Sequence, residues 1–129
     1  MFNESFSIVI VESQPLMRSA LNTTLSAEGM TILAVLANSE QVVRTASILT
    51  PNLILFSLSI PGWDDLQVIS TLRKELPSVL ILALVTGEFR EQEQAAQEHG
   101  AHMVLTKTVP RSELIKTVKR LKKFQFVDF

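Results

Sequence analysis

The stretch LILFSL, residues 53–58, is a continuous apolar run that one serine interrupts near its end. Apolar residues at successive positions are typical of strands that are covered on both faces, as they are in a parallel sheet. Four more segments have this character: residues 7–11 (SIVIV), 31–37 (TILAVLA), 79–85 (VLILALV) and, more weakly, 102–106 (HMVLT). The sequence therefore predicts five parallel strands.

The segments between these runs have the spacing of helices, because their apolar residues recur three to five positions apart. Pro15, Ser39 and Pro110 suit helix starts, Ser39 as an N-cap and Pro110 as the first helical residue. Gly29 and Gly100 suit helix ends, where a left-handed residue is common. Besides a more polar helix at residues 92–99, the expected apolar stripes are Leu16, Ala20, Leu21 and Leu25; Val42, Val43, Ala46 and Leu49; Leu66, Ile69 and Leu72; and Leu114, Ile115, Val118 and Leu121.

Strands and helices therefore alternate along the whole chain. With short connections and right-handed crossovers, this order winds helices onto both faces of a five-stranded parallel sheet, which is a doubly wound α/β fold. We expect one domain over residues 1–124 and a short tail over residues 125–129, since no linker-like composition interrupts the pattern.

The composition argues against several classes of function. Lys and Arg number 12 against 13 Asp and Glu, so the net charge of -1 does not favour direct binding of nucleic acid or of a membrane. With no cysteine and only two histidines, His99 and His102, we expect neither a thiolate site nor a self-sufficient histidine metal site. We also expect no cofactor. No apolar run reaches roughly 20 residues and the start does not resemble a signal peptide, so we expect a cytoplasmic protein.

Polar residues follow the predicted strands at four places. They are Glu12 and Ser13 after the first strand, Ser57 in the third, Thr86 after the fourth and Lys107 after the fifth. In an open parallel sheet, ligands bind beyond the carboxyl ends of the strands, so these side chains could form the remains of a phosphoryl site. Polar residues that only cap loops would give the same pattern, and no glycine-rich phosphate loop follows any strand.

Four sequence blocks carry a resemblance to a known family: VESQPLMRSAL (residues 11–21), PNLILFSLSIPGWDDL (51–66), LVTG (84–87) and GAHMVLTK (100–107). Over about residues 6–123 the chain resembles the receiver (CheY-like) domain of two-component response regulators. It is most similar to receivers that precede a helix-turn-helix output domain. The resemblance implies a flavodoxin-like fold with strand order 2-1-3-4-5.

In that family an aspartate at the end of the third strand accepts a phosphoryl group, and an acidic pair after the first strand helps it to hold Mg²⁺. Ser57 stands at the acceptor position, and the acidic pair is Glu12-Ser13, so one carboxylate remains of three. A single glutamate should hold Mg²⁺ weakly, and a serine without an adjacent base is a poor nucleophile. The resemblance therefore predicts a pseudo-receiver, without aspartyl phosphate and without a useful Mg²⁺ site.

The other positions match in part. Thr86 and Lys107 match the family's threonine and lysine, whereas Val104 replaces the aromatic residue that rotates on activation and Asp65 replaces a loop glycine. Because an unpaired ammonium in this pocket would be costly, we expect Lys107 to pair with Glu12 or to hydrogen-bond Ser57.

The favoured hypothesis is a binding module that signals by protein contacts and without phosphorylation. By resemblance, the contact surface is the face of the fourth helix, fifth strand and fifth helix, and a homodimer could form there or through the first and fifth helices. Candidate contact residues are Gln92, Ala95, Met103, Val104, Leu114 and Lys119, together with Trp63 in the loop after the third strand.

Two other hypotheses stay open. Ser57 could accept a phosphoryl group, with Thr86 and Lys107 as partners for the phosphoryl oxygens. Alternatively, the chain could be the receiver half of a transcriptional regulator whose DNA-binding domain lies elsewhere in the gene product.

Overall fold

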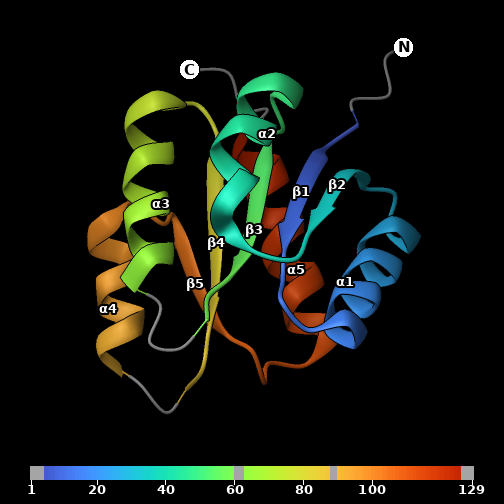
Figure 1. The fold of residues 1–129 in the computed structure, drawn as a ribbon. Coiled ribbons are helices and arrows are strands. Elements are labelled where there is room, and N and C mark those ends of the chain that lie inside the picture. The colour runs from blue at the N-terminus through green and yellow to red at the C-terminus, as the bar shows by residue number, and fades with distance from the viewer. Residues whose placement is uncertain (1–4, 60–62, 88–89, 126–129) are drawn as a thin grey trace.

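The computed structural model describes residues 5–59, 63–87 and 90–125. Within them, strands alternate with helices from one end to the other (Figure 1). The elements are β1 (Ser7–Val11), α1 (Pro15–Ala27), β2 (Thr31–Leu36), the 3₁₀ turn η1 (Ser39–Gln41), α2 (Val42–Leu49), β3 (Leu53–Ser57), α3 (Trp63–Glu75), β4 (Leu80–Val85), α4 (Arg90–His99), β5 (Met103–Thr106) and α5 (Arg111–Gln125). Among these helices, none combines the length and the apolar character needed to cross a bilayer.

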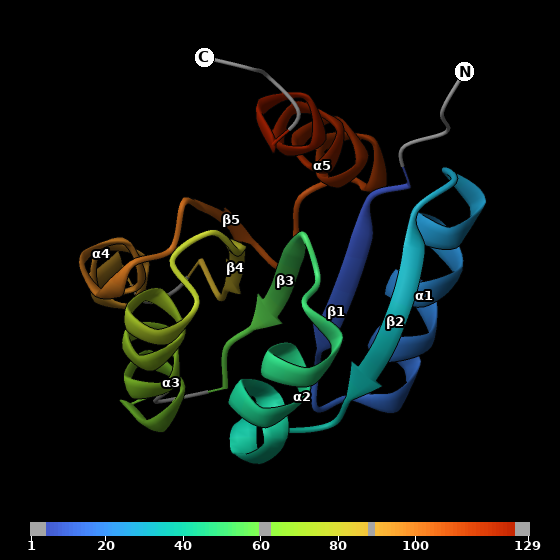
Figure 2. The same ribbon diagram turned by 90° about the horizontal axis from the view of Figure 1, so that it is seen from above.

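The five strands form one parallel sheet in the order β2-β1-β3-β4-β5. Seen from above, α1 and α5 cover one face of this sheet, and α2, α3 and α4 cover the other (Figure 2). The pairing of β1 with β2 contains one register shift, between Ile8 and Val9. The predicted doubly wound fold and strand order are therefore confirmed. The carboxyl ends of the strands all lie along the lower edge in Figure 1.

The core consists of two apolar layers, one on each face of the sheet. Every residue of β3 and β4 is buried, because these strands lie inside the sheet and are covered on both sides. Ile54 and Phe56 pack toward α2, α3 and α4, while Leu53 and Leu55 pack toward α1 and α5. The apolar run at residues 53–58 thus marks the centre of the domain.

Two helix starts differ from the prediction by one residue each. Asn38, and not Ser39, provides the cap: its Oδ1 accepts from the backbone N–H of Glu40 at 2.9 Å, so a 3₁₀ turn precedes α2. Pro110 lies just before α5, and its carbonyl accepts from the N–H of Glu113. Asn is as good an N-cap as Ser, so composition alone does not decide between neighbours.

Gly100, the predicted end of α4, does need to be glycine. Its φ of +125° is unfavourable for any residue with a side chain, and a Cβ there would overlap Cγ of Arg73. Arg73 in turn donates from Nη1 to the carbonyls of Pro77 and Val79, both at 3.1 Å. The turn after α4 is therefore fixed against the end of α3.

His102 lies just before β5 and contacts the backbone of β4. Its Nδ1 accepts from the N–H of Ile81 at 3.1 Å. Burial and then the nearby positive charge of Arg73 lower the pKa of His102 below its ordinary value of 6.5. A histidine with a lowered pKa in the folded state favours folding when it is neutral, so its contribution is present above pH 6.5 and is lost as the pH falls toward the lowered pKa.

We therefore expect His102→Asn, which keeps an acceptor but does not titrate, to flatten the loss of stability on mild acidification. Urea unfolding of both proteins across the pH range around 6.5 measures this difference. His99→Asn serves as the control, because that histidine contacts the Ala95 carbonyl within its own helix. Parallel profiles for the His102 variant and the unsubstituted chain would contradict the prediction.

Candidate functional site

The structure brings the predicted strand-end residues to one edge of the sheet. Ser57 is the last residue of β3 and lies opposite Leu84 of the neighbouring β4. Glu12 directly follows β1, and its N–H donates to the carbonyl of Leu36. Thr86 and Lys107 follow β4 and β5, which are also neighbours in the sheet. Ser13 is exposed beside Glu12.

Glu12 contributes a buried carboxylate, of which one oxygen is already in use. The residue is only 2% exposed, and its Oε2 accepts from the N–H of Gln14 at 2.9 Å. Arg18, one turn into α1, donates from Nη1 to the carbonyls of Glu12 and Ser13. The side chain of Glu12 therefore holds the turn between β1 and α1.

Lys107 does not make the predicted contact with Glu12 or Ser57. Its Nζ donates to the carbonyl of Leu58 at 2.7 Å. β3 ends at Ser57, so the carbonyl of Leu58 lies beyond the regular ladder and is available to the ammonium. The expectation of a Lys107 pair within the pocket is wrong because a backbone acceptor, which the sequence pattern does not display, lies within reach.

Three of the five site positions keep a buried polar atom with no hydrogen-bond partner among the described residues. These atoms are Oε1 of Glu12, Oγ of Ser57 and Oγ1 of Thr86. An unmet buried polar group costs about 1–3 kcal/mol, and native proteins contain few of them. Since three occur together at the ligand-binding edge of the sheet, the site has hydrogen-bonding capacity that the described residues do not use.

Asp65 is a buried carboxylate that organises the loop beside Ser57. Its Oδ2 accepts from both the N–H and the hydroxyl of Ser59, at 2.8 and 2.9 Å. The carbonyl of Ser59 then accepts from Nε2 of Gln92 at 2.8 Å, which links β3, α3 and α4. The sequence pattern marks Asp65 only as a departure from the family glycine and gives no sign of the roles of Ser59 and Gln92.

This network changes the predicted contact surface. Gln92 is 6% exposed and Leu114 is 7% exposed, so neither offers much surface to a partner. Gln92 turns inward to Ser59, and Leu114 belongs to the core layer beneath α1 and α5.

The remaining candidates keep some exposure: Ala95, Met103 and Val104 are half-buried, and Lys119 and Trp63 are exposed. Lys119 also forms an ion pair with Glu28 at 2.8 Å, between α5 and the end of α1.

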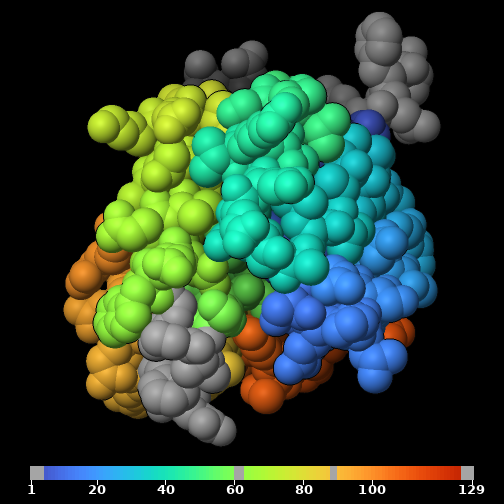
Figure 3. All heavy atoms as spheres, in the orientation of Figure 1, coloured from blue at the N-terminus to red at the C-terminus, as the bar shows by residue number. Residues whose placement is uncertain are grey.

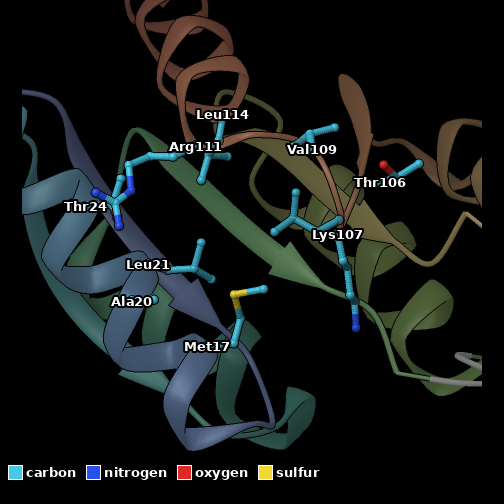
Figure 4. A pocket seen from close by; sticks show the side chains of 10 residues that line it. Met17, Ala20, Leu21, Thr24, Thr106, Lys107, Val109, Arg111 and Leu114 are labelled. Atoms are coloured by element: carbon cyan, nitrogen blue, oxygen red, sulfur yellow. The ribbon is translucent and has the colours of Figure 1, made fainter.

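A separate cavity of about 160 Å³ lies between α1 and the start of α5. Its walls are largely apolar, with Met17, Leu21 and Leu114 around it (Figure 4). Lys107 lines one side, but its amine end points away from Leu114 and Val109 in this view. The ammonium therefore belongs to the polar edge of the sheet and not to this apolar cavity.

The described acidic and imidazole side chains do not come together in any group of three that could hold a metal ion. Two carboxylates near the edge already accept hydrogen bonds from the protein: Glu12 accepts from the N–H of Gln14, and Asp65 accepts from the N–H of Ser59. As they stand, the described residues provide polar contacts for a ligand but no ready-made carboxylate cage.

Comparison with known proteins agrees with this geometry. The sequence pattern of the response regulator receiver domain matches residues 8–119. The chain is 28% identical over 116 residues to the nitrate/nitrite response regulator protein NarL of Escherichia coli, covering 89% of this chain and 54% of that protein. It is 25% identical to the DNA-binding transcriptional activator EvgA of the same organism, covering 88% and 56%. The chain thus spans about half the length of the curated relatives it matches.

A solved structure supports the fold at lower identity. The signal receiver domain of the putative response regulator NarL from Mycobacterium tuberculosis superposes with a TM-score of 0.85 at 21% identity, covering 94% of this chain and 98% of that one. Receiver domains are signalling modules that act through partner proteins such as kinases and output domains. Because the family pattern spans most of the described sheet and helices, this chain belongs to the response regulator receiver domain family.

Proposed function

We propose that this receiver domain signals through protein contacts and without phosphorylation of its own acceptor position. One observation carries the proposal: of the residues at the carboxyl edge that resemble the family's acidic triad, only Glu12 has a carboxylate, and its Oε2 already accepts from Gln14. Mg²⁺ requires near-octahedral oxygen coordination and gives up water reluctantly, so one partly used carboxylate provides little affinity.

The chemistry of Ser57 supports the same proposal. A serine hydroxyl needs a base beside it to become a nucleophile, and Ser57 Oγ has no hydrogen-bond partner within the described residues. Lys107, which would neutralise charge on a transferred group, is held by the carbonyl of Leu58. The described pocket residues therefore provide polar atoms, but they provide neither a base beside Ser57 nor the set of carboxylates that would hold Mg²⁺ against a phosphoryl donor.

The test is intact-mass measurement after incubation with acetyl phosphate and Mg²⁺. We expect the unsubstituted chain to gain no phosphoryl mass, and Ser57→Ala to behave identically. A mass gain that maps to Ser57 and disappears in Ser57→Ala would overturn the proposal and favour a serine phosphoacceptor.

The contact surface is proposed to include the exposed residues Trp63 and Lys119, together with half-buried Met103 and Val104. A homodimer through α4, β5 and α5, or through α1 and α5, would use part of this surface. Sedimentation velocity over a range of protein concentrations distinguishes a dimer from a domain that needs a different partner.

A second candidate is that the chain is the receiver part of a transcriptional regulator. It is favoured by the similarity to NarL and to the DNA-binding transcriptional activator EvgA, of each of which the chain covers little more than half. Reading the gene downstream of codon 129 tests this candidate. A continuous frame that encodes a helix-turn-helix domain supports it, and a stop codon there contradicts it.

A further inference from the structure

A second hollow opens beside Ser57, between the carboxyl ends of β1 and β3 and the starts of η1 and α3. Its volume is about 230 Å³. The described residues that line it are Val11, Ser13, Ala37, Asn38, Ser39, Glu40, Phe56, Ser57, Ser59, Asp64 and Asp65. The starts of α1 and α3 lie toward the lower edge of the molecule in the space-filling view (Figure 3).

The lining of this hollow is acidic. Glu40, Asp64 and Asp65 contribute three carboxylates, and none of the lining residues is a lysine, arginine or histidine. Two cations at the carboxyl edge of the sheet are held by other groups, because Lys107 donates to the carbonyl of Leu58 and Arg18 donates to the carbonyls of Glu12 and Ser13. Such a hollow attracts cations and repels phosphate.

A second observation indicates that a ligand fits here. Ser57 lines the hollow, is 7% exposed, and its Oγ has no hydrogen-bond partner within the described residues. A hydroxyl can accept from a ligand N–H, and burial makes an unmet hydroxyl costly. Because the described carboxylates do not form a metal-binding group, an organic cation with several N–H donors suits this lining better than a bare metal ion.

Two exposed apolar side chains lie next to this lining along the chain. Leu16, at 87% exposure, follows Ser13 by three residues, and Trp63, at 66% exposure, directly precedes Asp64. Tryptophan is enriched among the anchors of protein interfaces, and the exposed leucine adds apolar surface. They favour a cation presented by another protein over a free small molecule.

We propose that the hollow binds the guanidinium or ammonium group of an arginine or lysine side chain, which a partner protein presents between apolar residues that contact Leu16 and Trp63. The inference rests on the proposed contact function and names the chemistry of the partner. Guanidinium hydrogen bonds to Ser57 and ion pairs to Asp64 and Glu40 would satisfy both sides of the contact.

The test is a titration of the ¹⁵N-labelled full chain, followed by the amide signals of Ser57, Ser59 and Asp65. The first probe is agmatine, a free alkylguanidinium. The second is a helical peptide that carries one arginine between leucines, and the third is the same peptide with citrulline, which has the same shape without the charge. We expect saturable shifts with agmatine and at least about tenfold tighter binding of the arginine peptide.

Charge variants provide the matched control. Glu40→Gln/Asp64→Asn should weaken binding of the arginine peptide at least about fivefold, because it removes two charges from the hollow. Glu91→Gln/Glu93→Gln removes two charges from α4 and should leave binding unchanged. Leu16→Ala/Trp63→Ala should reduce peptide affinity to that of agmatine.

Three outcomes would overturn the inference: no shifts with agmatine or peptide, equal binding of the citrulline peptide, or shifts of these amides with inorganic phosphate instead. Agmatine that binds as tightly as the peptide would also overturn it, in favour of a free small cation. If these titrations fail, the proposal of signalling without phosphorylation still stands. A gain of phosphoryl mass on Ser57 would instead contradict that proposal, and it would not change the result of the titrations.

Discussion

The double variant Ser13→Asp/Ser57→Asp should bind Mg²⁺ at least about tenfold more tightly than the unsubstituted chain, since it raises the number of carboxylates at the three positions that correspond to the family's acidic triad from one to three. Both positions already lie where the ion would need them. Ser13 follows Glu12 at the end of β1, and Ser57 ends the adjacent β3. The scaffold therefore needs new oxygen ligands and no rearrangement of the sheet.

The same variant is expected to accept a phosphoryl group from acetyl phosphate. An oxygen of the new carboxylate at position 57 would form a bond to phosphorus as the bond to the acetate oxygen breaks, and acetate would leave with the electron pair. Thr86 and Lys107 stand at the ends of β4 and β5 and could contact the transferred oxygens, although Lys107 would have to leave the carbonyl of Leu58. Charge neutralisation by Mg²⁺ and the ammonium provides most of the catalysis in such a step.

Isothermal titration with MgCl₂ and intact-mass measurement after acetyl phosphate check the two expectations. Ser13→Asn/Ser57→Asn is the control, because it has nearly the same shape without the charges. If the aspartate variant neither binds Mg²⁺ more tightly nor gains mass, the missing carboxylates do not decide whether this site is phosphorylated, and the proposal of signalling without phosphorylation is contradicted.

Sequence reasoning predicts the scaffold of this domain better than the contacts within its site. The runs at β3 and β4 have one interpretation, because strands with apolar residues at every position need cover on both faces. The strand-end residues also gather as expected, because parallel strands bring their carboxyl ends to one edge. These inferences depend on periodicity and topology, which the sequence displays directly.

The individual contacts depend on backbone atoms and rotamers, which the sequence does not display. Lys107 donates to the carbonyl of Leu58 and not to Glu12 or Ser57, and Gln92, which the resemblance places on the contact face, turns inward to the carbonyl of Ser59. Asn38 and Ser39 are almost equal as N-caps, so the choice between them follows from the local path of the chain. A buried oxygen without a hydrogen-bond partner, such as Ser57 Oγ, can be identified only when the positions of all neighbouring atoms are known.

Ser57→Ala/Thr86→Val should stabilise the domain by about 2 kcal/mol, which is unusual for substitutions at a ligand-binding edge. Both hydroxyls are buried without a partner among the described residues, so each costs free energy in the folded state that it does not cost in the unfolded chain. Thr86→Val replaces the hydroxyl by a methyl group of similar size, and Ser57→Ala removes the hydroxyl and leaves only a small gap, so both remove that cost with little change in packing.

Urea unfolding, analysed for the free energy of unfolding, measures the effect. Ser59→Ala is the matched control, because its hydroxyl donates to Asp65 at 2.9 Å and its removal should destabilise by about 1 kcal/mol. A less stable double variant would show that bound water already satisfies Ser57 and Thr86, and the edge would then hold no unused hydrogen-bonding capacity. A more stable one would show that the domain keeps these two hydroxyls at the expense of its own stability, which is the behaviour of a site that is completed by something outside the chain.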